Sequence, residues 1–393
     1  MASGIKDKVS VIGMGCTKFG ERWMDSREDL ILEAVHEALE DAGMELDDID
    51  AFWFGSYYET CGYTISRVLK TNFKPVTRVE NNCCTGMEAF RNAAYGVASG
   101  AYDVVMAIGL EKLKDNGYSG NPDPMYYREN VSPTFGGPGG FSLFIPAYCD
   151  KYGVSYNDMR DAMSSVSFKN HANGALNPKA MYRKEVPIEK IKASPMVCEP
   201  YLTVMDCAGV SDGCACAIMT STENSGKYRS DPMYIKSVEV AASSGYGLIM
   251  NGYDYTTVQE TVHAAERAYK NAGITDPLHQ LSLVELHDCF TITEIVLYED
   301  LQFSKRGEGW KDALEGKYTR TGILPVNIDG GLKSFGHPIG ASGIRMIYES
   351  WLQFHGKAGA RQLENPKLGL AHNLGGYPWE NMSAVAIVGS ELG

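Results

Sequence analysis

The pattern of apolar and polar positions along the chain occurs twice. Apolar residues recur three and four positions apart in "LILEAVHEALEDAG" at 30–43 and in "TVHAAERAYKNAG" at 261–273, and both segments end in glycine. This spacing places the apolar side chains on one face of a helix, and the glycine is typical of a helix C-terminus. A run with the pattern of a buried strand follows each helix, "IDAFWFGS" at 49–56 and "LSLVELHD" at 281–288. The pattern therefore predicts an internal duplication.

Each half continues from its strand into a turn and a further helix, near Cys83 in the first half and near Gly340 in the second. The halves then end on apolar strands that we match to each other, "DVVMAIGLE" at 103–111 and "AVAIVGSE" at 384–391. Strands that alternate with helices predict parallel sheets covered by helices on both faces. The predicted fold class is therefore α/β, with one sheet in each half.

The segment 112–205 interrupts the repeat. It contains stretches rich in glycine and proline, a predicted helix from Tyr156 to Asn173, and a further loop-rich stretch. Insertions of this length are usually functional lids or binding loops. We therefore divide the chain into an N-terminal half of residues 1–111 and 206–231, an inserted cover region of residues 112–205, and a C-terminal half of residues 232–393.

Composition narrows the choice of partners and compartment. No apolar run approaches the roughly 20 residues that a membrane helix needs, and the N-terminus lacks the layout of a signal peptide, so we expect a cytoplasmic protein with no membrane partner. The net charge of −13 argues against nucleic acid as a partner, although an anionic cofactor would need only a local basic patch. Ten cysteines, some adjacent, predict free thiols rather than disulfides. The spacing in "CACA" does not suit zinc, and no metal is predicted.

Cysteine and histidine occur together in turn motifs at the ends of predicted strands and the beginnings of predicted helices. The motifs are "VENNCCTGMEAF" at 79–90, "VELHDCFTITE" at 284–294 and "GGLKSFGHPIGASG" at 330–343. The first presents Cys83, the second His287 and Cys289, and the third holds His337 in a tight Gly/Pro turn. Two thiols and two imidazoles in such positions are the parts of a site for acyl transfer through a thiolate.

In this order and spacing, "VENNCCTG", "HDCF" and "GHPIGASG" resemble the thiolase superfamily, and "HDCF" resembles its sterol-carrier-protein-2 branch. "SDGCACAIM" at 211–219 and "HNLGGYPWEN" at 372–381 extend the resemblance over essentially the whole chain. The resemblance implies a five-layered αβαβα sandwich in which the two halves share a central pair of helices. It also implies coenzyme A as a substrate, held by a cover region over the active site.

The resemblance assigns the nucleophile to Cys83, the first cysteine of the family's C-x-S/T-G motif. The amides at the beginning of the following helix would lower the pKa of this thiol. The alternative is a buried structural cysteine, a role that we assign instead to Cys84, which should point into the core. The resemblance makes His337 the group that takes the proton of Cys83 and then donates to a thioester oxygen. The alternative for His337 is a residue that only orders its turn.

The remaining catalytic positions follow from the same resemblance. His287 stands where other thiolases have the asparagine of "NEAF", and it would donate to an enolate oxygen. The chain has Asn373 where ordinary thiolases carry a second catalytic cysteine, so the resemblance assigns proton transfer to Cys289. The alternative for Cys289 is a small apolar residue that packs at a strand end. Gly375 matches a family glycine whose N–H joins that of Cys83 in a hole for the thioester oxygen.

Contacts to coenzyme A and partner chains are less defined. We predict contacts to coenzyme A from Lys169, His171 and Arg183, although His171 could instead cap a helix and the cations could be solvated surface groups. The resemblance implies a homodimer through the edge of the N-terminal sheet. It also implies a small second subunit of the zinc-ribbon and OB-fold (DUF35) type.

Several functions fit the motifs. The first is cleavage of a 3-oxoacyl-CoA, the second is condensation at the same site, and the third is an idle subunit that binds acyl-CoA. Cys289 favours cleavage, and the full set of Cys, His, His and Cys argues against an idle subunit. Aromatic residues in the loops favour a pocket for a bulky or aromatic acyl group, unless they serve only in packing. These residues are Tyr57, Tyr58, Tyr126, Tyr127, Tyr377 and Trp379.

Overall fold

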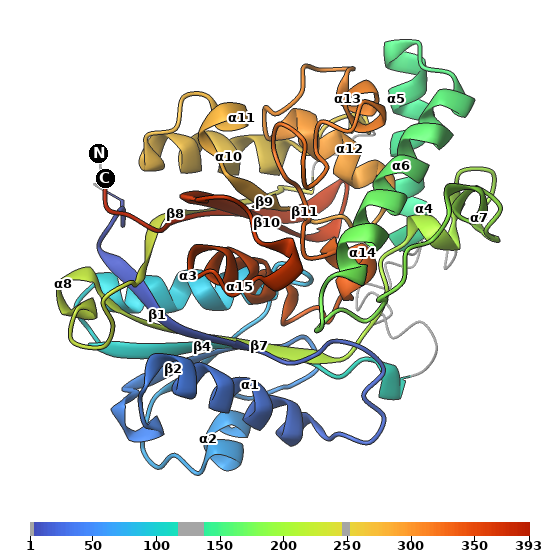
Figure 1. The fold of residues 1–393 in the computed structure, drawn as a ribbon. Coiled ribbons are helices and arrows are strands. Elements are labelled where there is room, and N and C mark those ends of the chain that lie inside the picture. Colours follow the sequence, from blue (N-terminus) through green and yellow to red (C-terminus); the bar gives the residue numbers. More distant parts are fainter. Residues whose placement is uncertain (1–3, 117–136, 246–251) are drawn as a thin grey trace.

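The computed structural model of the chain describes residues 4–116, 137–245 and 252–393. Elements of the first half alternate between strands and helices (Figure 1). They are β1 (Val9–Cys16), α1 (Arg27–Ala42), β2 (Ala51–Gly55), α2 (Tyr63–Leu69), β3 (Val76–Val79), α3 (Thr85–Ala98), β4 (Val104–Glu111), β7 (Gly213–Ser221) and α8 (Thr222–Ser225).

The second half and the segment between the halves are built as follows. The second half contains β8 (Met233–Ala242), α10 (Gln259–Ala272), α11 (Pro277–Gln280), β9 (Leu283–Glu285), α12 (Thr291–Asp300), α13 (Gly309–Leu314), α14 (Gly331–Phe335), α15 (Ser342–Phe354), β10 (Leu368–Tyr377) and β11 (Glu380–Gly389). The inserted segment contains α4 (Gly137–Ser142), α5 (Phe144–Tyr152), α6 (Tyr156–Ala175), α7 (Ile188–Lys192), β5 (Met196–Cys198) and β6 (Leu202–Thr203).

The main sheet is continuous in hydrogen bonding but folded into two layers. Its strand order is β3-β2-β4-β7-β1-β8-β11-β10-β9. Within the sheet, the two halves are joined where Ser10 and Val11 of β1 pair with Tyr234 and Met233 of β8. Helices α3 and α15 lie between the layers, α1 and α2 cover one outer face, and α10 to α12 cover the other (Figure 1). The five-layered αβαβα arrangement is confirmed.

The prediction of parallel sheets is wrong, because the sheet is mixed. Strand β2 is parallel to β3 and β4, and β9 is parallel to β10, but the other pairs in this sheet are antiparallel. Strands β10 and β11 pair as far as Tyr377 and Glu380, so a tight turn joins them. Such a short connection permits only an antiparallel pair, whereas a parallel pair needs a crossover.

The predicted match between the closing strands of the two halves is also wrong. Strand β4 lies between β2 and β7, and its counterpart by position is β10, which lies between β9 and β11. The segment 103–111 therefore corresponds to 368–377 and not to 384–391. Neighbouring strands that are buried on both faces have the same continuous apolar pattern, so the pattern alone does not distinguish them.

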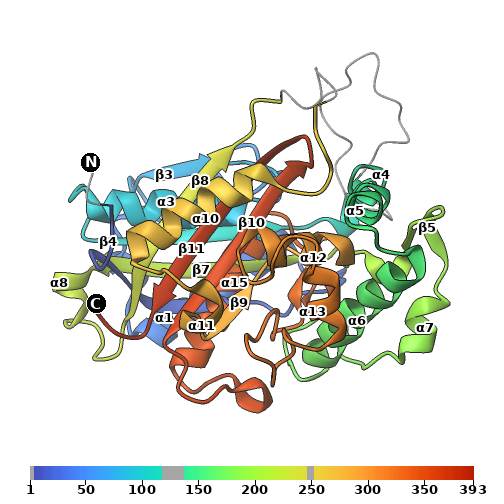
Figure 2. The same cartoon turned by 90° about the horizontal axis from the view of Figure 1, so that it is seen from above.

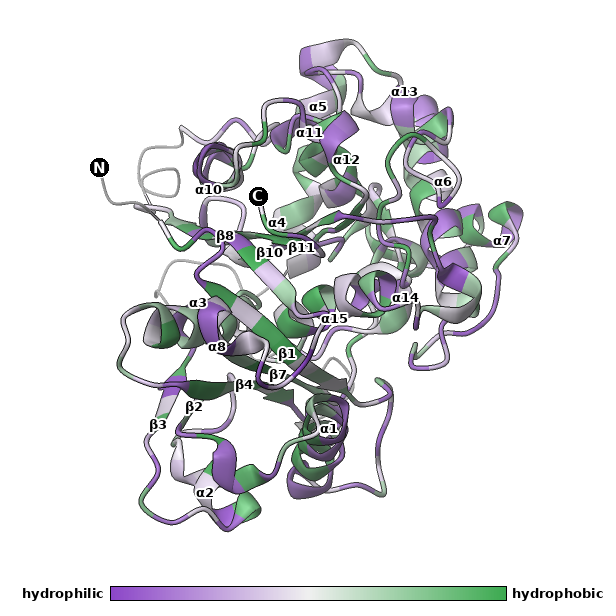
Figure 3. Ribbon diagram, turned by 60° about the vertical axis from the view of Figure 1, so that its left-hand side comes forward, coloured by the Kyte–Doolittle hydropathy of each residue, from purple (hydrophilic) through white to green (hydrophobic). Residues whose placement is uncertain are grey.

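The predicted helices form because their ends and faces are defined locally. Helix α1 begins with a capping box between Ser26 and Asp29 and ends at Gly43, whose φ is 65°. Helix α10 ends at Gly273, whose φ is 82°. Apolar residues concentrate on the strands and on the faces of helices that pack against them (Figure 3). Both predicted C-terminal glycines are confirmed, as is the helix that begins at Tyr156.

Glycines bring the beginnings of the two central helices into backbone contact. A Cβ atom on Gly86 of α3 would lie 2.7 Å from the carbonyl oxygen of Gly340, and one on Gly343 of α15 would lie 2.3 Å from the amide of Met87. A Cβ on Gly109 of β4 would also lie 2.2 Å from the Gly340 oxygen. No larger residue fits at these positions, and the turn before α3 therefore lies against the turn before α15.

The inserted segment packs at one end of the sandwich. Helix α6 contacts α12, α13 and α14, and α4 contacts β10 (Figures 1 and 2). Tyr126 and Tyr127, which were named as candidates for an acyl pocket, lie outside the described residues. Among the helices that the structure describes, none combines the length and the apolar composition needed to cross a membrane. All ten cysteines are free, as predicted.

Candidate active site

Cys83 lies in a tight turn between β3 and α3. Asn82 before it adopts φ of 49°, a left-handed conformation that asparagine tolerates better than most residues. The hydroxyl of Thr85 closes the turn, since it donates to the carbonyl of Asn82 (2.6 Å) and accepts from the amide of Asn81 (2.8 Å). Cys83 keeps partial exposure, whereas Cys84 is fully buried, as predicted. The turn thus leaves the thiol of Cys83 accessible and buries the thiol of Cys84 in the core.

Three motifs that are distant in sequence meet at this turn. The sulfur of Cys83 and one ring nitrogen each of His287 and His337 lie within 4.8 Å of one another. The two imidazole rings are nearly perpendicular, at 87°, with centroids 5.2 Å apart. The structure therefore places the predicted nucleophile beside both predicted histidines.

Asp288 holds the two histidine motifs together. Its buried carboxylate accepts hydrogen bonds from the amides of Leu332 (2.6 Å) and Lys333 (3.1 Å) at the beginning of α14, the helix that leads to His337. Asp288 directly follows His287 in sequence. A carboxylate at a helix N-terminus satisfies amides that have no partner within the helix. This contact fixes the distance between the two histidine-bearing segments.

Contacts of His337 define which of its ring nitrogens carries the proton. The hydroxyl of Ser342 donates to the carbonyl of Pro338 (2.9 Å), so it accepts from Nδ1–H of His337 (2.7 Å). In neutral imidazole the other nitrogen, Nε2, then carries a lone pair. This Nε2 is buried and has no hydrogen-bond partner among the described residues. His337 is thus arranged as a base.

The charge state of the pair differs from the sequence-based prediction. Burial, and then the carboxylate of Glu111, raise the pKa of the Cys83 thiol to about 12. Burial, and then Arg345, lower the pKa of His337 to about 3. The prediction that the helix N-terminus lowers the thiol pKa is wrong, because α3 begins only at Thr85 and burial in the turn has the larger effect. The free site holds a neutral thiol and a neutral imidazole.

Glu111 is a functional-site residue that the sequence analysis missed. Its buried carboxylate accepts from the hydroxyl of Ser56 (2.9 Å) and from the amides of Tyr57 (2.9 Å), Tyr58 (3.1 Å) and Gly340 (3.1 Å). Burial raises its pKa to about 7, against the effect of these hydrogen bonds. The signal in the sequence is an acidic residue at the end of the otherwise apolar strand β4. Glu111 ties the loop after β2 to the turn that presents His337.

A raised thiol pKa makes a testable prediction. The rate at which iodoacetamide alkylates Cys83 should rise about tenfold per pH unit from pH 7 to pH 10, because the thiolate fraction rises by that factor below the pKa. Peptide mass mapping over time would follow Cys83 separately from the other thiols, and half-buried Cys61 provides a comparison within the same chain. A plateau for Cys83 near pH 7 would show a thiolate and imidazolium pair instead.

Cys289 and Gly375 border the same turn. The sulfur of Cys289 lies 3.7 Å from the hydroxyl of Thr293, and burial raises its pKa well above the ordinary range, with the charge of Cys83 raising it further. A Cβ atom on Gly375 would lie 2.4 Å from the carbonyl of Asn81 and 3.1 Å from the amide of Cys83. Only glycine fits there, so β10 runs directly against the Cys83 turn.

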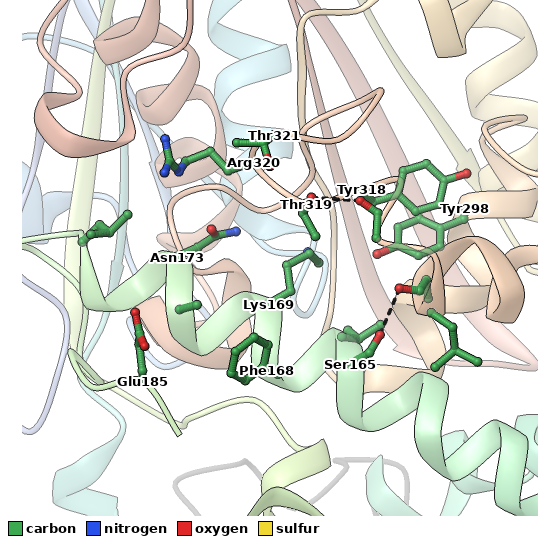
Figure 4. A pocket seen from close by; sticks show the side chains of 16 residues that line it. Ser165, Phe168, Lys169, Asn173, Glu185, Tyr298, Tyr318, Thr319, Arg320 and Thr321 are labelled. Atoms are coloured by element: carbon green, nitrogen blue, oxygen red, sulfur yellow. Dashed lines mark hydrogen bonds between the residues drawn. The ribbon is translucent and has the colours of Figure 1, made fainter. Parts of the chain in front are cut away.

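The residues predicted to contact coenzyme A have different surroundings. Lys169 is buried, pairs with Glu294 (2.8 Å), and lines a cavity of about 410 Å³ between α6 and the segment 313–321 (Figure 4). His171 lies two positions further along α6 and therefore on another side of the helix. Both of its ring nitrogens are buried with no hydrogen-bond partner among the described residues. Arg183 is exposed.

Aromatic side chains gather on two loops. The rings of Tyr57 and Tyr58 pack edge to face with centroids 5.4 Å apart, and those of Tyr377 and Trp379 stack at 5.3 Å. A Cβ atom on Gly140 would lie 3.0 Å from the Trp379 ring, so α4 packs closely over this stack. Tyr57 and Tyr58 follow β2, whereas Tyr377 follows Gly375 on β10. Glu111 links Tyr57 and Tyr58 by hydrogen bonds to the turn that presents His337, and Tyr377 follows Gly375 in sequence.

Comparisons with known proteins identify the family of the chain. Residues 9–200 match the thiolase N-terminal domain, and residues 241–388 match the thiolase C-terminal domain-like family. An acetyl-CoA acetyltransferase of Methanothermobacter thermautotrophicus is 36% identical over 382 residues, which cover 94% of this chain and 96% of that protein. Sterol carrier protein 2 of Bos taurus is 30% identical over 95% of this chain and 71% of its own length.

Solved structures show the same fold. The Ltp2-ChsH2(DUF35) aldolase superposes with a TM-score of 0.82 at 23% identity, covering 98% of each chain. An acetyl-CoA acetyltransferase from Syntrophomonas wolfei superposes with a TM-score of 0.70 at 17% identity, covering 98% of this chain and 100% of that one. Cys83 and His337 lie at the beginnings of the two central helices, α3 and α15, and His287 lies beside them. The chain belongs to the thiolase family, whose members use coenzyme A as a substrate and need no metal.

Proposed function

We propose that this chain is a thiolase that cleaves a 3-oxoacyl-CoA with coenzyme A through an acyl group on Cys83. The observation that carries the proposal is the cluster of Cys83, His287 and His337, in which the sulfur and one ring nitrogen of each histidine lie within 4.8 Å of one another. The lone pair on Nε2 of His337 supports its role as the base. A site with a nucleophile, a base and a second donor has the parts that acyl transfer requires.

The first half of the reaction forms the acyl-enzyme. Nε2 of His337 takes the thiol proton of Cys83, and the thiolate attacks the ketone carbon of the substrate. The bond between the ketone carbon and the α-carbon then breaks, and its electron pair moves onto the departing acyl-CoA as an enolate. His287 and protonated His337 donate to the enolate oxygen, and the thiol of Cys289 protonates the α-carbon.

The second half returns the enzyme to its starting state. The thiol of free coenzyme A gives its proton to the Cys289 thiolate and attacks the acyl group on Cys83. The amide N–H groups of Cys83 and Gly375 stabilise the oxyanion, and their segments are in close contact. The Cys83 thiolate leaves and recovers its proton from His337, so both thiols and the imidazole end as they began.

For the substrate, we propose benzoylsuccinyl-CoA, cleaved to benzoyl-CoA and succinyl-CoA in the degradation of aromatic compounds. The stacked Tyr377 and Trp379 beside β10 support a pocket for an aromatic acyl group. The second candidate is acetoacetyl-CoA, with the enzyme acting in the condensing direction. The 36% identity to an acetyl-CoA acetyltransferase favours this second candidate.

A panel of 3-oxoacyl-CoA substrates tests the function. Purified protein is incubated with coenzyme A and each substrate, and product masses are recorded with time. Formation of benzoyl-CoA and succinyl-CoA from benzoylsuccinyl-CoA supports the first candidate, and selective cleavage or synthesis of acetoacetyl-CoA supports the second. If acyl-CoA binds without any turnover across the panel, both with and without an added DUF35-type subunit, the chain is an idle binding subunit.

We further propose a homodimer that works with a small zinc-ribbon and OB-fold subunit of the DUF35 type. Strand β3 is an edge strand of the sheet, which leaves one side open for pairing across a dimer. The similar Ltp2-ChsH2(DUF35) structure includes a DUF35 protein. Lys179 pairs with Glu37 and Lys169 with Glu294, which leaves Arg183 and Lys184 as exposed candidates for the coenzyme A phosphates. A partner would complete that anionic site.

Activity of the purified chain should therefore depend on the second subunit. We expect light scattering to give the mass of a dimer, and turnover to rise at least about tenfold when a DUF35-type subunit is added. The control is the second subunit alone, which lacks the cysteine and histidine site. Full activity from this chain in a preparation free of any second polypeptide would remove the partner from the mechanism.

A further inference from the structure

The side chain of Asn373 contacts a catalytic histidine from the strand behind it. Asn373 is fully buried on β10, and its amide nitrogen Nδ2 lies 3.1 Å from Nδ1 of His287. Asn373 stands where ordinary thiolases carry a second catalytic cysteine, and its amide does not transfer a proton. An amide NH₂ group only donates hydrogen bonds, so Nδ1 of His287 is the acceptor. The proton of neutral His287 is then on Nε2.

The two catalytic rings are thus held in opposite states. Ser342 accepts from Nδ1–H of His337 and leaves Nε2 of that ring as an acceptor, whereas Asn373 donates to Nδ1 of His287 and leaves Nε2 of that ring as a donor. The rings are perpendicular, with centroids 5.2 Å apart. One ring can therefore take a proton while the other donates a hydrogen bond, although both are neutral.

We propose that Asn373 is a positioning residue that fixes His287 in its Nε2–H tautomer, so that His287 donates to the enolate oxygen while His337 acts as the base. The catalytic part of this inference rests on the proposed function, whereas the tautomer itself does not. Without the amide, neutral His287 could carry its proton on either nitrogen, and only one of these forms donates from Nε2.

The surroundings of His287 make the choice of tautomer matter. Burial, followed by its neighbours His337, His372 and Arg345, lowers the pKa of His287 well below the ordinary value. The ring therefore stays neutral at physiological pH, and it has a single N–H to place. A protonated ring would donate from both nitrogens and would need no such control. Because the ring of His287 is uncharged, the hydrogen bond from Asn373 determines which of its nitrogens carries the proton.

An isosteric substitution tests the inference. A carboxylate accepts but does not donate, so Asn373→Asp should draw the proton of His287 onto Nδ1 and remove the Nε2 donor. We expect kcat to fall by about 10² to 10³, the range for loss of one oxyanion donor, with KM for coenzyme A changed less than about threefold. Asn373→Ala, which permits both tautomers, should lose less. Alkylation of Cys83 should follow the same pH profile in all three proteins.

Nitrogen-15 NMR of histidine-labelled protein reads the tautomer directly. Wild-type His287, assigned by the loss of its signal in His287→Gln, should show a protonated Nε2, and Asn373→Asp should show a protonated Nδ1. The matched control is Asn173→Asp, which alters a buried amide that donates to the carbonyl of Asn327 (2.9 Å) and should leave the His287 signal unchanged.

Two outcomes would overturn the inference. One is an Nδ1–H tautomer of His287 in the wild type, and the other is a wild-type kcat in Asn373→Asp. If the aspartate variant does not fold, the wild-type spectrum and the alanine variant still decide the matter. A wild type that cleaves no 3-oxoacyl-CoA but shows the Nε2–H tautomer would refute the proposed function and leave the tautomer assignment standing.

Discussion

Replacing Cys83 with serine should lower turnover by at least about 10⁴-fold and abolish any acyl adduct, since a hydroxyl is a far weaker nucleophile than a thiol at neutral pH. A serine hydroxyl gives up its proton to His337 far less readily than the thiol of Cys83 does, because the ordinary pKa of an alcohol lies well above that of a thiol. Steady-state rates, together with the mass of the intact protein after addition of an acyl-CoA, would measure both effects.

The adjacent cysteine supplies the control. Cys84 is fully buried, and its thiol donates to the carbonyl of Asn373 at 3.5 Å. Cys84→Ser should therefore retain the acyl adduct on Cys83, with a loss of stability of roughly 1 to 3 kcal/mol for a changed buried group. An acyl group mapped to Cys84 in the wild type would show that the nucleophile was assigned to the wrong thiol.

Replacing Cys289 with alanine should separate the two parts of the reaction. The variant should still accept an acyl group on Cys83 from a simple acyl-CoA, because the departing coenzyme A thiolate, unlike the enolate of the cleavage step, can leave without a proton from Cys289. Cleavage of a 3-oxoacyl-CoA should fall by about 10² to 10⁴, the usual contribution of a positioned acid or base. Rapid-quench measurement of the adduct beside steady-state thiolysis would give both rates.

Cys207, a second half-buried thiol near the site, provides a control for the removal of a sulfur atom that has no catalytic role. The thiol of Cys207 donates to the carbonyl of Thr203 (3.4 Å), and its segment pairs with Phe290 next to Cys289. Cys207→Ala should therefore keep both acylation and cleavage. Near-normal cleavage by Cys289→Ala would refute the role of Cys289 as acid and base. Cys289 would then be a small apolar residue that packs at the end of its strand.

Local signals in the sequence were sufficient for the helices and for naming Cys83, His287 and His337, which the structure brings together. Gly43 and Gly273 end α1 and α10 because a left-handed residue is needed there, and that need is a property of a few neighbouring residues. The motifs around Cys83 and His337 likewise lie in short stretches of sequence, since a glycine-rich turn before a helix is a local structure. The five-layered arrangement followed from the resemblance to the thiolase superfamily.

Strand direction and chemical environment were decided only by the tertiary structure. The apolar runs of β4, β10 and β11 are alike, so their pairing and direction depend on neighbours that are distant in the sequence. The pKa of Cys83 was predicted in the wrong direction because its burial and the carboxylate of Glu111 come from other segments. The contact between Asn373 and His287 joins two strands of the folded sheet. Local sequence determined which groups are present, and their protonation depends on surroundings that only packing creates.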